Sequence, residues 1–211
     1  VTHYFCVPQM AAMLRADPAF EPEALRRLTA IFSGGAPHAA DAIRAWTEVG
    51  IPIADGFGMS EAGTVSCMPL DIDLIDSHAG SAGLVPPGVE LRIIDDQGKD
   101  CAAGEAGEIV VRGAGVSGGY WRRPAQTRSS FTAEGWFKTG DVGRMDAEGF
   151  LWLIDRKKDM FISGGENVYP AEIERALAGH PDIVECAVVG VSDERWGEAG
   201  YLVIVPIPGR D

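Results

Sequence analysis

The sequence predicts an α/β layer, then a β-rich region, and then the opening of a small α+β domain. Up to about residue 77, short apolar segments alternate with segments whose apolar residues recur at helical spacing. After residue 77, short strand-like segments are separated by glycine-rich turns. We therefore expect an α/β part over 1–77, a β-rich part over 78–154, a connection over 155–158 and the α+β part over 159–211.

The α/β part alternates strands and helices, which predicts parallel neighbouring strands joined by right-handed crossovers. Pro8 stands where a helix tolerates its missing N–H, and Gly50 stands where a helix ends. Both glycine-rich loops, 33–35 and 55–58, then lie at the carboxyl ends of strands, where open α/β sheets bind ligands. The expected elements are strands over 4–7, 28–32 and 51–54 and helices over 8–16 and 37–49.

The β-rich part predicts a small antiparallel sheet or barrel. Its expected strands cover 89–94, 108–112 and 150–154, and the charged run 155–159 is a plausible boundary. Beyond that run, we expect a helix over 171–178 and strands over 183–191 and 201–205.

Composition excludes several classes of protein. The net charge of −13 repels a nucleic-acid backbone, so nucleic acid is a poor partner. No apolar stretch approaches the roughly 20 residues of a membrane helix, and the start shows no signal peptide. The four cysteines are far apart without CxxC spacing, which indicates reduced thiols in a cytoplasmic protein rather than a metal site.

Two motifs in the α/β part suit a phosphate-bearing ligand. Ser33-Gly34-Gly35-Ala36-Pro37 joins a strand to a helix, and its glycines permit close approach to the backbone. Gly56-Phe57-Gly58-Met59-Ser60-Glu61 offers a ring face, a hydroxyl and a carboxylate suited to Mg²⁺ shared with phosphates. Each also fits an ordinary turn, a core phenylalanine or a helix-start acid.

Two further motifs follow. Trp136-Phe137-Lys138-Thr139-Gly140-Asp141 places an acid after a glycine turn, where one carboxylate could accept hydrogen bonds from both hydroxyls of a ribose. The segment 163–170, Ser-Gly-Gly-Glu-Asn-Val-Tyr-Pro, follows a strand and precedes a helix. An aspartate in a turn and a plain loop are the alternatives.

In combination and order, these motifs resemble those of the adenylate-forming superfamily, which includes acyl-CoA synthetases, luciferases and peptide-synthetase adenylation domains. The resemblance covers essentially the whole chain, through SGGAP, DGFGMSEAG, GEIVVRG, GYW, GWFKTGD and DRKKDMFISGGENVYPAEIE. It implies the end of a large AMP-binding domain over 1–154, with a parallel α/β layer and a small barrel-like antiparallel subdomain. A small C-terminal domain would follow the hinge at 155–158.

The resemblance implies ATP-dependent activation of a fatty or related carboxylic acid to an acyl-adenylate, followed by transfer to coenzyme A. ATP or AMP, Mg²⁺ and coenzyme A are then the expected cofactors. The small-molecule acid is the expected substrate, and the oligomeric state stays open. Similarity assigns Gly35, Ala36 and Pro37 to the adenine pocket and Phe57 to stacking on the base. It assigns Ser60 to the α-phosphate, Glu61 to Mg²⁺, Asp141 and Arg156 to the ribose, Lys158 to the hinge and Gly165 to the pantetheine tunnel. The positions that border the acyl pocket are Gly34, Gly56, Thr64, Val65 and Gly58, and Gly58 also counts among the nucleotide-binding residues.

The family's phosphate loop and the catalytic lysine of its first half-reaction are expected before residue 1 and after residue 211. We therefore expect the 211-residue chain by itself to be inactive in ATP–pyrophosphate exchange. Two alternatives stay open: an adenylating enzyme that delivers to a carrier protein, and a non-catalytic nucleotide-binding module.

Overall fold

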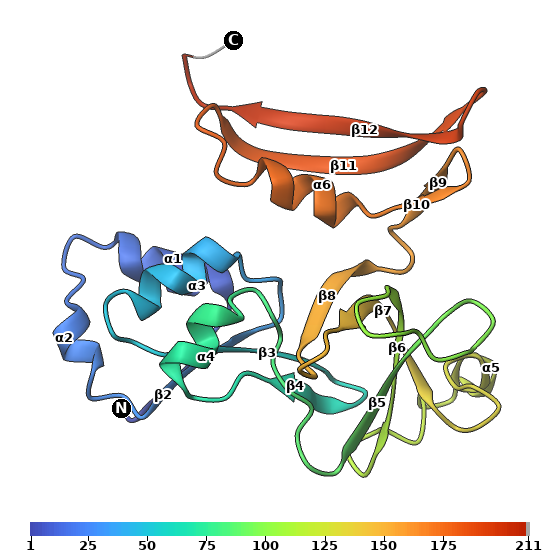
Figure 1. The fold of residues 1–211 in the computed structure, drawn as a ribbon, viewed down its shortest axis with the longest axis horizontal. Helices are drawn as coiled ribbons and strands as arrows, with labels where there is room; N and C mark the ends of the chain where they lie inside the picture. The colour runs from blue at the N-terminus through green and yellow to red at the C-terminus, as the bar shows by residue number, and fades with distance from the viewer. Residues whose placement is uncertain (210–211) are drawn as a thin grey trace. The chain divides into compact units, whose positions relative to one another are not determined.

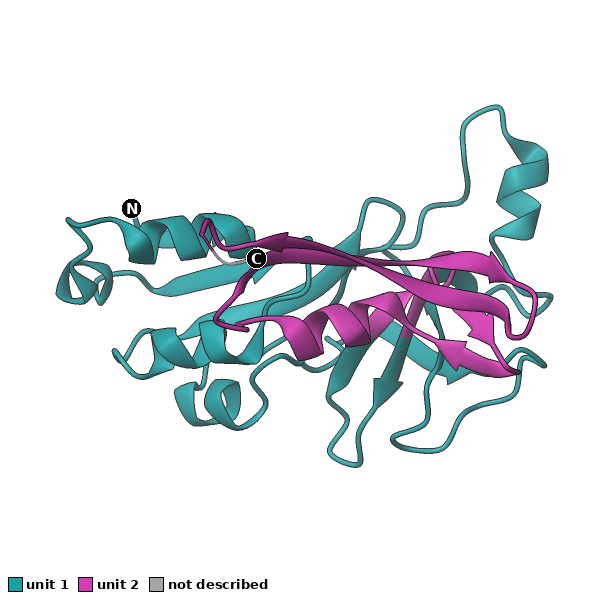
Figure 2. Ribbon diagram, turned by 90° about the horizontal axis from the view of Figure 1, so that it is seen from above, with its two compact units in different colours: residues 1–139, 143–153 teal, residues 140–142, 154–211 magenta. Residues whose placement is uncertain are grey.

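The computed structural model describes residues 1–209, which fall into two compact units (Figures 1 and 2). Unit 1 comprises residues 1–139 and 143–153, and unit 2 comprises residues 140–142 and the chain from 154 onward. The helices are α1 Pro8–Ala16, α2 Pro22–Leu25, α3 Ala40–Thr47, α4 Ile72–Ser77, α5 Pro124–Ser129 and α6 Pro170–Leu177.

The first sheet of unit 1 has the order β1-β2-β3-β4. β1, β2 and β3 run parallel, as predicted, and β4 is antiparallel to β3. Helix α1 packs on β1 and β2, and α3 packs on β3 and α4. The carboxyl ends of β2 and β3 therefore lie at one edge of this sheet. The strands are β1 His3–Cys6, β2 Ala30–Gly34, β3 Ile53–Met59 and β4 Gly63–Cys67.

Strand β3 differs most from the prediction, because it continues through the glycine motif that we expected to be a loop. Gly56 to Met59 pair with β4, and Gly63, at φ +67°, forms the tight turn of this hairpin. Helix α3 is shorter than the predicted 37–49, since Ala39 is still extended, at φ −63° and ψ 137°. Gly50, at φ +74°, follows the helix as predicted.

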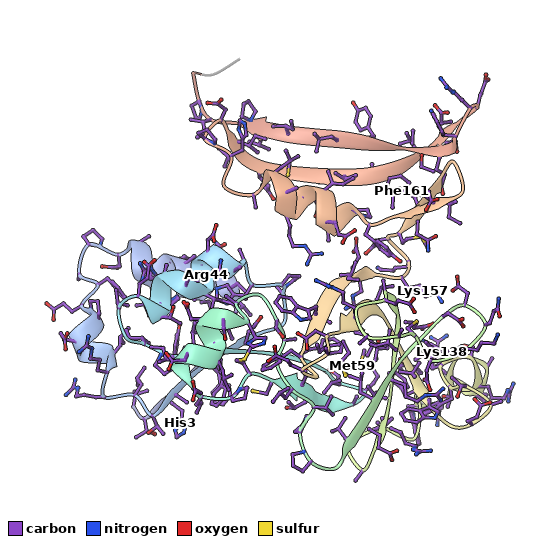
Figure 3. All side chains as sticks on the ribbon, viewed as in Figure 1. His3, Arg44, Met59, Lys138, Lys157 and Phe161 are labelled. Carbon is purple, nitrogen blue, oxygen red and sulfur yellow. The ribbon has the colours of Figure 1, made fainter. Side chains whose placement is uncertain are left out.

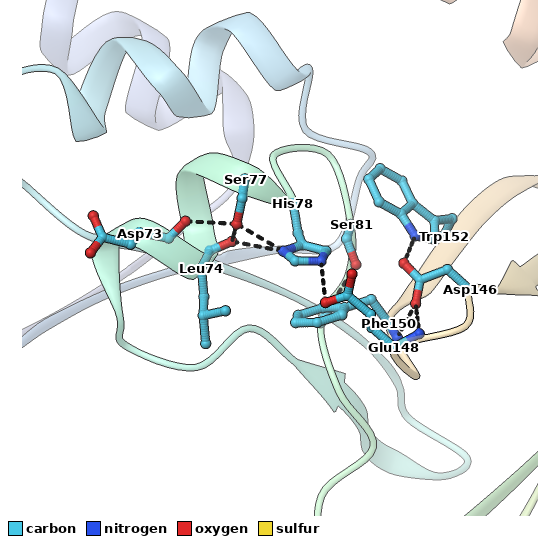
Figure 4. Close-up of polar contacts among 10 residues, drawn as sticks. Asp73, Leu74, Ser77, His78, Ser81, Asp146, Glu148, Phe150 and Trp152 are labelled. Carbon is cyan, nitrogen blue, oxygen red and sulfur yellow. Dashed lines mark hydrogen bonds and ion pairs between the residues drawn. The ribbon is translucent and has the colours of Figure 1, made fainter.

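Helix α4, which the sequence did not predict, is tied to the turn between β7 and β8 (Figure 4). Asp71 caps it by accepting hydrogen bonds from the N–H groups of residues 73 and 74. At its other end, the His78 ring stacks on Phe150 with 3.7 Å between centroids, and His78 Nε2 lies 3.5 Å from Glu148 Oε2. These contacts join α4 to the second sheet within unit 1.

The second sheet has the order β5-β6-β7-β8, with β5 and β6 antiparallel. Its two ends are separate edges, so the sheet is open and the barrel-like closure implied by the resemblance is not present in the described residues. Strand β7 was missed, because Gly140, at φ +74°, and the charged residues beside it read as a turn. The strands are β5 Val89–Ile94, β6 Gly107–Gly113, β7 Phe137–Met145 and β8 Leu151–Arg156.

Unit 2 contains a sheet of order β10-β9-β12-β11, with α6 packed on β11. The Phe161 ring lies under the β11–β12 hairpin (Figure 3), where a Cβ on Gly190 would come within 2.6 Å of the Phe161 side chain. Glycine at this position therefore lets the aromatic ring pack directly on the strand backbone. The strands are β9 Phe161–Ser163, β10 Glu166–Val168, β11 Ile183–Asp193 and β12 Gly197–Pro206.

Among the residues the structure describes, no helix is both long and apolar enough to cross a membrane.

Candidate functional site

An open groove of about 450 Å³ lies at the carboxyl ends of β2 and β3 in unit 1. It brings together the two glycine motifs that the sequence singled out, although they are separated in the chain. Phe5 and Phe32 stack on each other at this groove, with 5.1 Å between their ring centroids. The predicted site residues that line it are Gly34, Gly35, Gly56, Phe57, Gly58 and Thr64.

The glycines of this groove are required by the backbone itself. A Cβ on Gly34 would lie 3.0 Å from the carbonyl oxygen of Gly56, and a Cβ on Gly56 would lie 3.0 Å from that of Ser66. A Cβ on Gly58 would lie 2.6 Å from the carbonyl oxygen of Gly63. Close backbone packing therefore explains these glycines.

The remaining predicted residues of the two motifs lie in different surroundings. Ala36 and Pro37 are exposed in the loop between β2 and α3. Phe57 is half-buried and packs against the second hydrophobic cluster of unit 1 as well as lining the groove. Val65, assigned by resemblance to the acyl pocket, is fully buried in that cluster, so its side chain does not line the groove.

Ser60 and Glu61 occupy the turn between β3 and β4. Ser60 is exposed, and Glu61 is half-buried and accepts a hydrogen bond from the hydroxyl of Tyr120 at 2.9 Å. The described residues hold no cluster of three or more metal-ligating side chains. A single carboxylate beside a hydroxyl fits Mg²⁺ that takes its other ligands from phosphates and water, rather than a cage made only of protein.

Three buried polar groups near the same ends of the strands were missed by the sequence reasoning. Asp55 and Ser33 are register partners on β3 and β2, so their side chains leave the same face of the sheet. Asp55 Oδ1, Ser33 Oγ and His38 Nδ1 have no hydrogen-bond partner among the described residues. Buried polar atoms are normally paired, so these groups are candidates to meet a ligand.

Burial sets the charge state of two of these groups. Desolvation raises the pKa of Asp55 to about 7, although a hydrogen bond from the Gly56 backbone opposes the rise. Burial also lowers the pKa of His38, which favours the neutral imidazole. Asp55 is the first residue of the motif DGFGMSEAG, so the sequence did point to this position. The burial of its side chain depends on tertiary packing, which the sequence alone does not reveal.

The predicted ribose residues meet in unit 2. Asp141, in β7, is 8% exposed, and its Oδ1 lies 3.0 Å from Nε of Arg156, at the end of β8. Burial raises the pKa of Asp141, and the Arg156 guanidinium opposes that rise. The arrangement keeps a buried carboxylate beside a cation that is itself more than half exposed.

Lys158 and Gly165 also belong to unit 2. Lys158 is exposed in the turn after β8 and borders a polar cavity of about 390 Å³. Gly165 lies exposed in the turn between β9 and β10, at φ +91°, a conformation that favours glycine. Asp155 ties the end of β8 to the start of α6 by accepting a hydrogen bond from the N–H of Ala171 at 2.9 Å.

Comparison with known families supports the class that the fold and motifs indicate. Residues 1–121 match the family described as AMP-binding enzyme, and residues 172–211 match the AMP-binding enzyme C-terminal domain. The chain belongs to this adenylate-forming family, which confirms the resemblance predicted from the sequence.

Individual relatives agree. The chain is 42% identical over 209 residues to a feruloyl-CoA synthase from Amycolatopsis sp., covering 99% of this chain and 42% of that protein. It is also 42% identical to an indoleacetate–CoA ligase from Aromatoleum aromaticum, covering 100% of this chain and 41% of that protein. The structure of ATP-bound MatB from Rhodopseudomonas palustris superposes with a TM-score of 0.91 at 36% identity, covering 100% of this chain and 42% of that one. The chain thus spans about two fifths of the length of these relatives.

Proposed function

We propose that the protein containing this chain joins a carboxylic acid to ATP, releases pyrophosphate and transfers the acyl group from the adenylate to coenzyme A. The observation that carries the proposal is the groove at the ends of β2 and β3, where both glycine motifs of an adenylate-forming enzyme converge. The names of the relatives, a feruloyl-CoA synthase and an indoleacetate–CoA ligase, support the choice of coenzyme A as acceptor.

We assign unit 1 to the adenine, the α-phosphate and the acyl group. The loop of Gly35, Ala36 and Pro37 and the ring of Phe57 would enclose the base, and the buried Asp55 would accept a hydrogen bond from its amino group. The Ser60 hydroxyl would donate to the α-phosphate. Gly34, Gly56, Gly58 and Thr64 would border the acyl group, and Val65 would support them from the core.

Glu61 is our proposed ligand for Mg²⁺, together with oxygens of the nucleotide. When bound, this ion neutralises charge that develops on the phosphates during adenylation. The role of the chain is to present the Glu61 carboxylate at a fixed place in the hairpin turn.

Unit 2 would supply the ribose contact and the hinge. Asp141 would accept hydrogen bonds from the ribose hydroxyls, with Arg156 holding its carboxylate in place. Residues 155–158 would form the hinge, since the exposed side chain of Lys158 does not hold this segment in the core. Gly165 would lie beside the pantetheine arm. The domain boundaries at 154 and 159 remain part of this proposal.

The substrate we propose is an acid that carries an aromatic ring. The stacked Phe5 and Phe32 rings offer an aromatic surface at the groove, and the names of the curated relatives contain feruloyl, indole and benzoate groups. The fatty acid favoured by the sequence resemblance is the competing choice. We also place the protein in the cytoplasm, because all four cysteines are free thiols.

The experiment is ATP–pyrophosphate exchange with the full-length protein and a panel of aromatic and long-chain acids, followed by assay of thioester formation with coenzyme A. We expect exchange with an aromatic acid and a coenzyme A thioester as product. Exchange without thioester formation would instead favour another acyl acceptor. A carrier protein and amines should then be tested as acceptors, since the chain is structurally similar to the amide bond synthetase McbA. Absence of exchange with every acid would contradict the proposal.

A further inference from the structure

The carboxylate of Glu61 stands on a hairpin turn, a place where a side chain ordinarily keeps much rotational freedom. Its neighbour Ser60 is exposed, and Gly63 completes the turn with φ +67°. A glutamate that must meet a cation at a fixed place would lose that freedom on binding, at a cost in affinity. Contacts that fix the carboxylate beforehand reduce this cost.

Two hydrogen bonds from a distant segment supply such contacts. The hydroxyl of Tyr120 donates to Glu61 Oε1 at 2.9 Å, across a separation of 59 residues. The N–H of Ser117 donates to the carbonyl oxygen of Glu61 at 2.7 Å. The first bond fixes the side chain and the second fixes its backbone.

Tyr120 is itself held in place. Its N–H donates to the Oγ1 of Thr127, in α5, at 2.9 Å. Gly119, at φ +135°, lies so close to Thr127 that a Cβ there would overlap the threonine methyl group. On the side of the turn, a Cβ on Gly115 would lie 3.1 Å from the carbonyl oxygen of Ala62. The segment from 115 to 120 therefore fits closely between α5 and the turn.

The chemistry of the donor matters. A carboxylate has two oxygens, and a phenol that donates to one of them leaves the negative charge in place. An arginine or lysine at the same distance would neutralise much of that charge and compete with a metal ion. The Tyr120 hydroxyl therefore holds the Glu61 carboxylate by a hydrogen bond without removing its charge.

We infer that Tyr120 is a positioning residue that holds one oxygen of Glu61 and thereby directs the other toward the divalent cation that accompanies the nucleotide. This inference rests on the proposed function, because that function supplies the cation. A purely structural role for Tyr120 would lower stability without changing the dependence on the cation.

The test is Tyr120→Phe in the full-length protein. We expect the Mg²⁺ concentration for half-maximal ATP–pyrophosphate exchange to rise about 10-fold, the scale of losing one hydrogen bond to a charged group, while the KM for the acid stays the same. Tyr4→Phe is the matched control, because Tyr4 is also half-buried in unit 1 and its hydroxyl has no hydrogen bond among the described residues. It should leave the Mg²⁺ dependence unchanged.

A second readout needs no turnover. Titration of Mn²⁺ into the protein with nucleotide, followed by electron paramagnetic resonance, should show weaker Mn²⁺ binding in Tyr120→Phe and normal binding in Tyr4→Phe. If Tyr120→Phe folds poorly, Thr127→Val serves instead, since it removes the acceptor for the Tyr120 N–H and leaves the phenol in place. It should shift the Mg²⁺ dependence in the same direction by a smaller factor.

The double variant tests whether Tyr120 affects cation binding through Glu61. In a Glu61→Gln background, Tyr120→Phe should change the Mn²⁺ affinity no further, because its only path is through Glu61. Equal Mn²⁺ and Mg²⁺ dependence in the wild type and Tyr120→Phe, or additive losses in the double variant, would overturn the inference. A wild-type protein that shows no exchange with any acid would instead count against the proposed function.

Discussion

Asp55 and Asp141 are two aspartates of nearly equal burial, 6% and 8% exposed, that the molecule treats differently. Asp55 lies near the end of the parallel part of the first sheet in unit 1. No cation is paired to it among the described residues, and its pKa is raised to about 7. Asp141 lies in unit 2 with the Arg156 guanidinium 3.0 Å away, which opposes the rise of its pKa.

Burial raises the pKa of both aspartates, and a neighbouring guanidinium opposes that rise only in Asp141. A buried acid without a counter-charge takes up a proton near neutral pH, whereas an acid beside a guanidinium keeps its charge more readily. A site that must accept hydrogen bonds from ribose hydroxyls gains from the charged form, and Asp141 is arranged to keep it. Asp55 is better suited to a single hydrogen bond with a neutral ligand.

The largest effect is expected from Asp55→Asn. In the wild type, the folded state holds a proton on Asp55 between the ordinary pKa of 3.8 and about 7, where the unfolded state does not. Stability therefore falls as pH rises through this window, by up to about 4 kcal/mol. Asparagine is neutral throughout, so the variant should lose this slope and be more stable than the wild type above pH 7.

Urea denaturation at about pH 5 and about pH 8.5 measures this change. Asp41→Asn is the control, because the Asp41 side chain is 98% exposed and should leave the slope unchanged. Parallel pH profiles for the wild type and Asp55→Asn would show that the two buried aspartates do not differ in the way described.

Asp141→Ala should produce the next largest effect, on nucleotide affinity. Removal of a charged acceptor for two ribose hydroxyls should weaken AMP binding at least about 100-fold, since each such hydrogen bond contributes roughly 1.5–3 kcal/mol. Isothermal titration calorimetry with AMP measures the loss. Asp159→Ala, which removes an exposed acid from the same unit, should bind AMP normally. Unchanged affinity in Asp141→Ala would remove Asp141 from the proposed ribose site.

The sequence predicted those parts of the fold that depend on local pattern. The helix over 8–16 has the predicted bounds, and the strand over 89–94 does as well, because their signals lie within one segment. Strand β3 was predicted too short, because its glycines were interpreted as a loop. These glycines instead pack against the backbone of β4, a contact that exists only once the hairpin has formed.

The same limit applies to the site. The motifs led to Glu61 and Asp141, but not to Asp55, whose pKa depends on how deeply the sheet edge is buried. Tyr120 stands in the quoted GYW motif, yet its partner lies 59 residues away, and no local spacing indicates that contact. Residues that carry chemistry were therefore easier to predict than the residues that set their charge or orientation.

Arg156→Met is the most sensitive test of the contrast and has the smallest expected effect on stability. Methionine keeps much of the side-chain length but removes the guanidinium, so the pKa of Asp141 should rise further and approach the behaviour of Asp55. Because the Arg156 side chain is 56% exposed, the change in unfolding free energy at neutral pH should be only about 1 kcal/mol. Carbon-13 NMR of the aspartate carboxyl groups follows the titration, and Arg156→Lys, which keeps the charge, should move the Asp141 signal much less. If the Asp141 titration is the same in the wild type and Arg156→Met, then something other than the guanidinium separates the two aspartates.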